Sequence, residues 1–374
     1  MVLGKTRSLT LQLKPRSIES SFIISNRPIF GPAFIMSMMS TPSVKVKLGT
    51  VHYPDKPIVN LKLGTIQLTH KPTASLRYSF AAGDGDDNKT LVVFLNGLIL
   101  PQSSWAETIS QIAIKTQEAN NLRPHLLSYD RYGQGLSDRD PNGTHDVEDV
   151  VTDLYAFLQA FTEKELNSRS PRHLILVGNS IGCAFARLYA VAHPGTVSGF
   201  IFLDSIMAHI DLASLWPDPD DPKFDEKELP KGTTTDQLRD IRDKYRTIFD
   251  VYTSNAEELD RSGLPELLPL AYTPKLQGPD GPPWITVIGH DPDTFAAENE
   301  RSYGVPQALV NKYINPIWHE YNEGLTRLTE DEERRAGPAM AGRCGHFIQR
   351  DDPVLTAERV LVMLHKTSCT WYAR

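Results

Sequence analysis

One serine of the chain stands in a context that suits a nucleophile. Ser180 is the centre of a G-x-S-x-G segment, residues 178–182, which follows the apolar run 174–177 and precedes an alanine-rich stretch. A serine hydroxyl is a weak nucleophile and must be exposed on a sharp turn within reach of a base. Glycines two positions before and after it let a strand and a helix approach closely enough to form that turn. The pattern predicts acyl-transfer chemistry at Ser180 rather than a serine that only caps a tight turn.

Two other features of the sequence supply the remaining parts of this chemistry. The backbone N–H of Ile181 and the positive end of the helix expected after it are placed to stabilise an oxyanion. Among the 11 histidines, His346 stands out because it follows residues 343–345, Arg-Cys-Gly, and precedes the amphipathic stretch 354–364. We interpret His346 as the general base for Ser180.

Two further segments carry recognisable motifs. Residues 129–137 read YDRYGQGLS, and residues 345–353 read GHFIQRDDP. With the G-x-S-x-G segment, and in this order, they make the chain similar to the α/β-hydrolase superfamily, particularly to fungal-type members with a helical cap. The resemblance runs from about residue 44 to the C-terminus. It implies a nucleophile–acid–base order in which His346 comes last, and it implies neither a metal nor an organic cofactor.

The resemblance also assigns roles to two loops. The segment 129–137 looks like the DRxGxGxS turn of the superfamily, which is structural, so Asp130 and Ser137 are not counted as catalytic. Asn96-Gly97 stands where relatives often carry His-Gly. This position implies that Leu98 gives the second backbone N–H of the oxyanion hole, a role that the asparagine leaves intact because the donor is main chain.

The acid of the triad stays open between three aspartates. The resemblance places it after the seventh strand, which here ends at Gly289 and is followed by Asp291 and Asp293. Relatives often have two residues between that glycine and the acid, whereas this sequence offers one or three. Asp204, directly after the sixth strand, is the position that some members use instead. We take Asp291 as the first choice, with Asp204 and Asp293 as alternatives. The acid would fix the imidazole tautomer and stabilise the imidazolium.

These residues need a sheet to bring them together, and the sequence predicts one. Strand-like apolar runs cover 91–95, 125–129, 173–177, 200–203 and 284–288, with short edge strands expected at 44–48 and 75–80. Helical patterns cover 104–120, 147–161, 181–193 and 354–364. Strands that are apolar throughout and alternate with helices indicate a mostly parallel, doubly wound sheet covered on both faces. The expected fold class is therefore α/β, with the α/β-hydrolase fold.

The alternation of strands and helices is interrupted once, in a polar, proline-rich block with a charged helix near 235–249. We interpret the block as a helical cap above the carboxyl edge of the sheet, with most of its aromatic side chains packed in its own core. An extra helix is expected near 305–325. The predicted parts are an N-terminal extension (1–43, disordered or targeting), the first part of the core (44–205), the cap (206–283) and the second part of the core (284–374).

Composition limits the partners and the compartment. A net charge of −7 without a basic stripe argues against nucleic-acid binding, and the absence of a run of 18 apolar residues argues against a membrane span. Three cysteines without metal-type spacing favour an intracellular, cytoplasmic protein. The first forty residues are basic and serine-rich, with Glu19 as their one acid, so a mitochondrial transit peptide is the alternative to a plain extension or a start placed too early.

Together these patterns predict a serine hydrolase that cleaves an ester, thioester or related carbonyl substrate by a Ser-His-Asp acyl-enzyme mechanism. Its expected partner is a small-molecule acyl substrate. The alternatives are an acyltransferase that uses the same triad and a ligand-binding or scaffold protein that keeps the fold without turnover. A serine at position 180 argues against epoxide hydrolase and haloalkane dehalogenase chemistry, for which the superfamily carries aspartate there.

Overall fold

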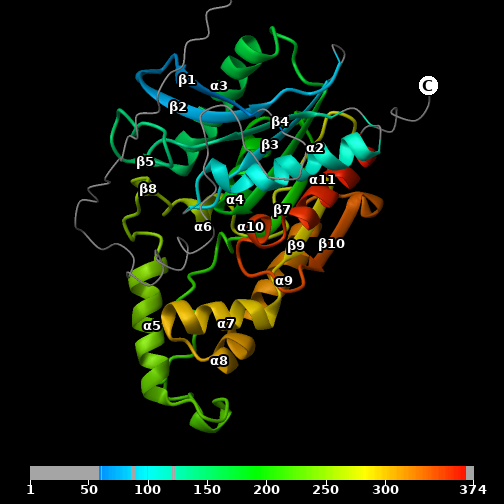
Figure 1. Ribbon diagram of the computed structural model, residues 1–374. Helices are drawn as coiled ribbons and strands as arrows, with labels where there is room; N and C mark the ends of the chain where they lie inside the picture. Colours follow the sequence, from blue (N-terminus) through cyan, green and yellow to red (C-terminus); the bar gives the residue numbers. More distant parts are fainter. Residues whose placement is uncertain are drawn as a thin grey trace, which may run out of the picture.

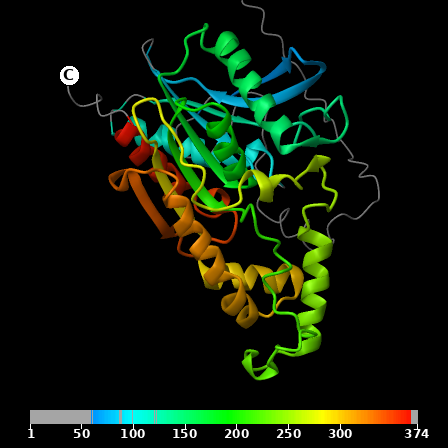
Figure 2. The same ribbon diagram turned by 180° about the vertical axis from the view of Figure 1, so that it is seen from behind.

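A twisted eight-stranded sheet forms the centre of the molecule, with helices on both of its faces (Figure 1 and Figure 2). The computed structural model describes residues 59, 61–85, 89–98, 100–119, 121 and 123–367. The strands of this sheet are β1 (Lys62–Leu68), β2 (Lys71–Ala81), β3 (Thr90–Leu95), β4 (His125–Tyr129), β6 (His173–Ser180), β7 (Val197–Ser205), β9 (Trp284–Gly289) and β10 (Arg335–Met340). Their spatial order is β1-β2-β4-β3-β6-β7-β9-β10. The pairings of β2 with β1 and β4 are antiparallel, and those from β4 to β10 are parallel.

Helices cover both faces because the central strands are apolar on both sides. One face carries α2 (Ala106–Glu118) and α11 (Pro353–Thr367), and the other carries α3 (Val147–Glu165) and α4 (Ile181–Ala192). The strands β3 and β7 are buried along their whole length, as expected for a parallel sheet between two helical layers. The architecture confirms the predicted doubly wound sheet and the α/β-hydrolase fold.

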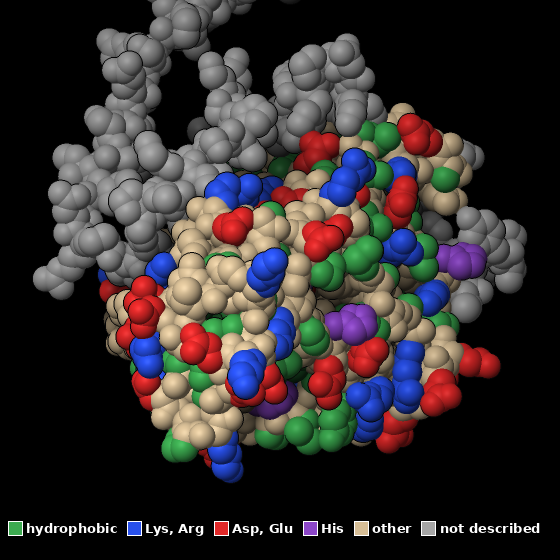
Figure 3. Space-filling view, turned by 90° about the horizontal axis from the view of Figure 1, so that it is seen from below, with side chains coloured by type: hydrophobic (Ala, Val, Ile, Leu, Met, Phe, Trp, Pro, Cys, Tyr) green, Lys and Arg blue, Asp and Glu red, His purple; other side chains and the backbone are tan. Residues whose placement is uncertain are grey.

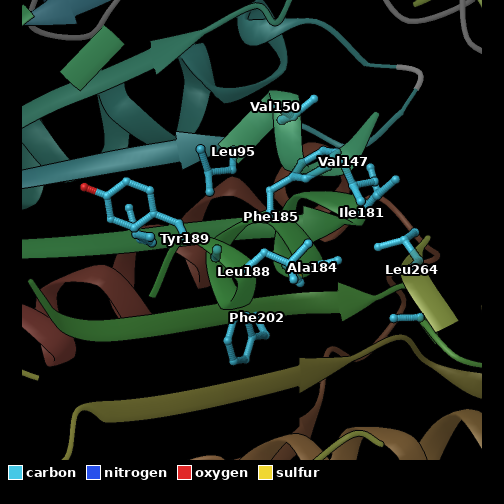
Figure 4. Packing of buried hydrophobic residues seen from close by; sticks show 14 of the residues in the cluster. Leu95, Val147, Val150, Ile181, Ala184, Phe185, Leu188, Tyr189, Phe202 and Leu264 are labelled. Atoms are coloured by element: carbon cyan, nitrogen blue, oxygen red, sulfur yellow. The ribbon is translucent and has the colours of Figure 1, made fainter. Parts of the chain in front are cut away.

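The helix that begins beside Ser180 is held by the larger of the two buried clusters. Ile181, Ala184 and Leu188 of α4 lie in this cluster with Leu95 of β3 and Phe202 of β7 (Figure 4). Each fully buried large aliphatic side chain contributes about 1.5–3 kcal/mol relative to an exposed one. The packing therefore fixes the start of α4 against the end of β6.

A helical lobe lies beyond the carboxyl edge of the sheet (Figure 1 and Figure 2). It contains α5 (Thr235–Phe249), α7 (Pro292–Tyr303) and α8 (Gln307–Tyr313). The hydroxyl of Tyr245 in α5 donates to Oδ1 of Asn299 in α7 at 2.7 Å, and Phe249 meets Tyr303 edge-on with ring centroids 5.4 Å apart. The lobe is thus assembled from two stretches of chain, one before β9 and one after it.

The remaining elements are short or join the lobe to the core. They are β5 (His145–Asp146), β8 (Leu259–Asp260), α6 (Leu264–Leu267), α9 (Asn315–Thr326), α10 (Ile348–Asp351) and three 3-10 turns at Gln102–Trp105, Glu226–Glu228 and Glu332–Arg334. Among the residues that the structure describes, no helix is both long and apolar enough to cross a membrane.

The structure differs from several sequence-based expectations. The expected helix near 305–325 is two helices, α8 and α9, of which α8 belongs to the lobe, and α7 precedes them. The edge strands β1 and β10 were not predicted, because neither contains a continuous apolar run. The strand expected at 44–48 and the extension 1–43 lie outside the described residues.

Candidate active site

Ser180 lies on a sharp turn between β6 and α4. Its backbone angles are φ 56° and ψ −125°, a conformation that residues with a Cβ rarely adopt. Its two flanking glycines make the turn feasible. A Cβ on Gly178 would lie 2.7 Å from the backbone nitrogen of Cys183, and one on Gly182 would lie 2.3 Å from the carbonyl oxygen of Leu95. The G-x-S-x-G pattern is therefore a steric requirement of this turn.

The imidazole of His346 lies in the loop after β10, at the same edge of the sheet. Its Nδ1 is 2.6 Å from Oδ2 of Asp204, the penultimate residue of β7, whose side chain is fully buried. A carboxylate only accepts hydrogen bonds, so Nδ1 carries a proton, and in the neutral ring the lone pair is then on Nε2. This is the tautomer that a general base requires.

The structure differs from the first choice for the acid, because Asp291 is used elsewhere. Its Oδ1 accepts the N–H groups of Asp293 and Thr294 at the start of α7, and its Oδ2 accepts the N–H of Arg343 at 2.8 Å. Asp293 is exposed on the first turn of α7. The chain enters α7 directly after β9, so both aspartates serve the helix start. Of the three candidate aspartates, Asp204 is the one that is hydrogen-bonded to the imidazole of His346.

A second histidine, His290, shares the carboxylate of Asp204. Its Nδ1 lies 2.8 Å from Oδ1 of Asp204, and its Nε2 lies 3.1 Å from Oδ1 of Asn315. The amide nitrogen of Asn315 donates to the carbonyl of Pro292 and to Oδ1 of Asn311, which fixes the orientation of that amide. Both ring nitrogens of His290 therefore face acceptors and must both donate. The network assigns His290 as an imidazolium.

The charges of this network support one another. Burial alone would raise the pKa of Asp204, but the imidazoles of His290 and His346 lower it to about 2. Burial lowers the pKa of His290, yet the carboxylate of Asp204 outweighs this effect and the net shift is upward. A buried carboxylate thus stays ionised because one imidazolium faces its first oxygen and the His346 ring faces its second.

The loop after β3 packs directly against the elbow. A Cβ on Gly97 would lie 3.3 Å from the Cβ of Ser180. The carbonyl of Gly97 accepts from Nη2 of Arg131 at 2.9 Å and from Nε2 of Gln134 at 2.8 Å. In a trans peptide the N–H of the next residue points opposite to the carbonyl. The N–H of Leu98 is therefore directed away from Arg131 and Gln134.

Ser180 and His346 line one cavity of about 160 Å³ between the sheet edge and the lobe. Its wall is mainly aliphatic and aromatic, with side chains from the core and from both stretches of the lobe, such as Leu98, Leu212, Phe249, Phe295, Ile314 and Trp318. A cavity of about 150 Å³ with an aliphatic lining holds a molecule of the size of benzene. The cavity therefore has room for an apolar group of about six carbon atoms.

The aromatic residues of the predicted cap divide between two roles. Trp216 is fully buried and packs edge-on against Tyr245 with ring centroids 5.0 Å apart. Tyr245 and Phe249 also line the cavity, whereas Tyr252 is exposed. The expectation that most of these rings only pack the core of the cap therefore holds for Trp216 and not for the rings of α5.

Comparison with known proteins gives the family. A family model described as "Alpha/beta hydrolase family" matches residues 92–359, more than half of the chain. The chain belongs to the alpha/beta hydrolase family. A search of curated proteins finds no match.

Solved structures similar to this α/β-hydrolase share little sequence with it. A membrane phospholipase A, described as a novel bacterial virulence factor, is 18% identical with a TM-score of 0.45, over 82% of this chain and 86% of that chain. A putative lipase from Acinetobacter baumannii AYE is 14% identical with a TM-score of 0.47, over 83% and 93%. A Vigna radiata epoxide hydrolase mutant is 12% identical with a TM-score of 0.47, over 82% and 99%.

In this α/β-hydrolase the turn after β4 is a structural support. Oδ1 of Asp130 accepts the N–H of Gln102 at 2.7 Å, and Oδ2 accepts the N–H of Leu136 at 3.2 Å. A Cβ on Gly135 would overlap the same carboxyl group, and the hydroxyl of Ser137 donates to the carbonyl of Asp130. These contacts hold the turn and join it to the 3-10 turn at Gln102–Trp105.

Asn179 is a connecting residue that the sequence did not reveal. Its amide nitrogen donates to the carbonyls of Leu203 at 3.0 Å and His346 at 2.9 Å, and its Oδ1 accepts from Nε2 of Gln349 at 3.2 Å. One buried side chain thus ties the elbow to the end of β7 and to the histidine loop. Its position as a variable residue of G-x-S-x-G gives no signal of this role.

Proposed function

We propose that this α/β-hydrolase is a serine hydrolase that cleaves an ester, thioester or related carbonyl substrate through an acyl-enzyme. The observation that carries the proposal is one juxtaposition. A serine held on a strained turn and a histidine whose Nδ1 is bound to a buried carboxylate line the same apolar cavity. This arrangement supplies a nucleophile, a base and a place for an acyl group.

In the proposed acylation step Oγ of Ser180 attacks the substrate carbonyl while Nε2 of His346 takes its proton. Asp204 is the proposed acid, because it holds the ring in the required tautomer and stabilises the imidazolium that forms. The backbone N–H groups of Ile181 and Leu98 are the proposed oxyanion donors, since one begins α4 and the other lies in the loop packed on the elbow. His346 then protonates the leaving group.

In the proposed deacylation step water takes the place of the leaving group. His346 accepts a proton from that water, the hydroxide adds to the acyl carbon, and Ser180 leaves with the proton that His346 returns. The largely apolar lining of the cavity favours a small-molecule substrate with an apolar acyl group.

Covalent labelling with a fluorophosphonate probe tests the proposal directly. The wild-type chain is expected to react and to hydrolyse p-nitrophenyl esters, whereas Ser180→Ala should lose the label and several powers of ten in turnover. Ser302→Ala is the matched control, because this second serine lines the same cavity.

The outcome also tests the ligand-binding alternative. A folded wild-type protein that neither labels nor turns over any ester would favour a ligand-binding role and overturn the proposal. Labelling of the Ser180→Ala protein equal to that of wild type would exclude Ser180 as the nucleophile.

A further inference from the structure

A buried arginine, Arg261, lines the same cavity as Ser180 and His346. It follows β8, at the junction between the lobe and the core, and only 5% of its surface is exposed. A guanidinium keeps its charge in proteins and presents a fork of N–H donors. Burying such a group normally requires an anionic or fully hydrogen-bonded environment.

The described residues satisfy the Arg261 guanidinium only in part. Its Nη2 donates to the carbonyls of Asp250 at 2.7 Å and Thr253 at 3.3 Å, and its Nε is buried without a hydrogen bond. No carboxylate of the described part of the chain forms an ion pair with it. Glu257, the buried carboxylate nearby, is bound in bidentate fashion by Arg131. Burial lowers the pKa of Arg261 despite the neighbouring acidic groups, as expected for a cation without a direct counter-ion.

The other charged groups of the cavity have partners. Arg301 lies 3.8 Å from Glu298, and Arg350 pairs with Asp351 at 3.0 Å. The surface does not add a strong field of one sign, because acidic and basic side chains alternate over the face seen in Figure 3. A preference for charged substrates would therefore depend on a side chain inside the cavity. Among the described residues that line the cavity, Arg261 is the cation without an acidic partner.

We propose that Arg261 binds a free carboxylate of the substrate. The preferred substrates are then esters or thioesters with an apolar body that carry this carboxylate in addition to the reacting carbonyl group. The proposal rests on the proposed function, since it concerns the same cavity. A carboxylate would occupy the position of the missing counter-ion and accept charge-assisted hydrogen bonds, which are strong where water is excluded. A neutral ester of the same length would displace water from Arg261 and offer it no acceptor.

Two matched substrates test this inference. p-Nitrophenyl hexanoate and the mono-p-nitrophenyl ester of adipic acid have acyl chains of equal length, and only the second ends in a carboxylate. Wild type is expected to favour the adipate ester at least tenfold in kcat/KM, mainly through KM. The corresponding esters of glutaric, suberic and sebacic acids, each with its neutral counterpart, vary the distance between the carboxylate and the reacting carbonyl.

Three variants show whether Arg261 is responsible. Arg261→Gln should reduce the preference about tenfold or more while kcat for the hexanoate ester changes little. Arg261→Lys should keep part of the preference, because it retains a charge but loses the planar fork. Arg301→Gln is the matched control, since this arginine lines the same cavity, is paired with Glu298 and should leave the ratio unchanged.

The wild-type measurement keeps the test decisive even where Arg261→Gln does not fold. A wild-type protein that hydrolyses the neutral esters through Ser180 but favours no acid-bearing ester at any chain length would overturn the role of Arg261 alone. A folded Arg261→Gln protein with the wild-type ratio would do the same. A wild-type protein that hydrolyses neither kind of ester would overturn the proposed function, and this inference with it.

Discussion

Replacing Asp204 by asparagine is the sharpest test of the proposed catalytic network. The fully buried carboxylate accepts from Nδ1 of His346 and from Nδ1 of His290. In the variant the amide can direct its nitrogen at His346, which favours a proton on Nε2 and removes the lone pair that Ser180 needs. We expect kcat to fall by about 10⁴, or about 5 kcal/mol of transition-state stabilisation.

The same change should also affect stability, because His290 loses its counter-ion. Breaking a buried ion pair by removing one partner costs about 3–5 kcal/mol, and the release of a proton from His290 limits the cost to the lower end of that range. The melting temperature should therefore fall, and more at pH 6 than at pH 8. Thermal unfolding at both pH values establishes that the kinetic assay is run on folded protein.

Asp291→Asn is the matched control, since both aspartates lie at or just beyond the carboxyl ends of strands at the same edge of the sheet. Asparagine caps helices about as well as aspartate but cannot also accept the N–H of Arg343. This variant should therefore lose about 1 kcal/mol of stability and keep its kcat within about tenfold. Steady-state hydrolysis of one p-nitrophenyl ester compares the two. A loss of three powers of ten in Asp291→Asn beside nearly full activity in Asp204→Asn would refute the assignment of Asp204.

Three further predictions concern His290, Gly182 and the N-terminal segment. The pKa of His290 is raised in the folded state, so the stability that this residue contributes is complete below its unfolded pKa and is lost as the pH rises through its folded pKa. The melting temperature of wild type should therefore fall more steeply between pH 6 and pH 9 than that of His290→Gln. Equal slopes would contradict the assignment of His290 as an imidazolium. Gly182→Ala should abolish labelling of Ser180, because its Cβ would meet the carbonyl of Leu95 at 2.3 Å. Gly342→Ala, whose Cβ meets no atom within 4 Å, is the control, and normal labelling of folded Gly182→Ala would contradict the steric argument. A chain that starts at Met39 should keep its melting temperature and activity, because the removed residues carry no core pattern, and a clear drop in melting temperature would show that they pack on the domain.

Local patterns in the sequence were sufficient for the sheet and for the turn that carries Ser180, and they also led to the prediction of His346 as the base. A nucleophile turn needs glycines at fixed offsets from the serine, and a parallel sheet needs apolar runs separated by helices, so both requirements are written in neighbouring residues. The edge strand β10 escaped prediction because its residues are only partly buried and carry no such pattern.

The partners of those residues depended on the tertiary structure. Asp204 and Asp291 both follow strands and look equivalent in the sequence, but the first ends a buried strand beneath the His346 loop and the second caps α7. His290 and Arg261 likewise become distinctive only through what faces them. Their surroundings come from segments that are far apart in the chain. Burial and hydrogen bonding across those segments decide which side chains keep a charge and which remain unpaired. They also decide which carboxylate accepts a hydrogen bond from the imidazole of His346.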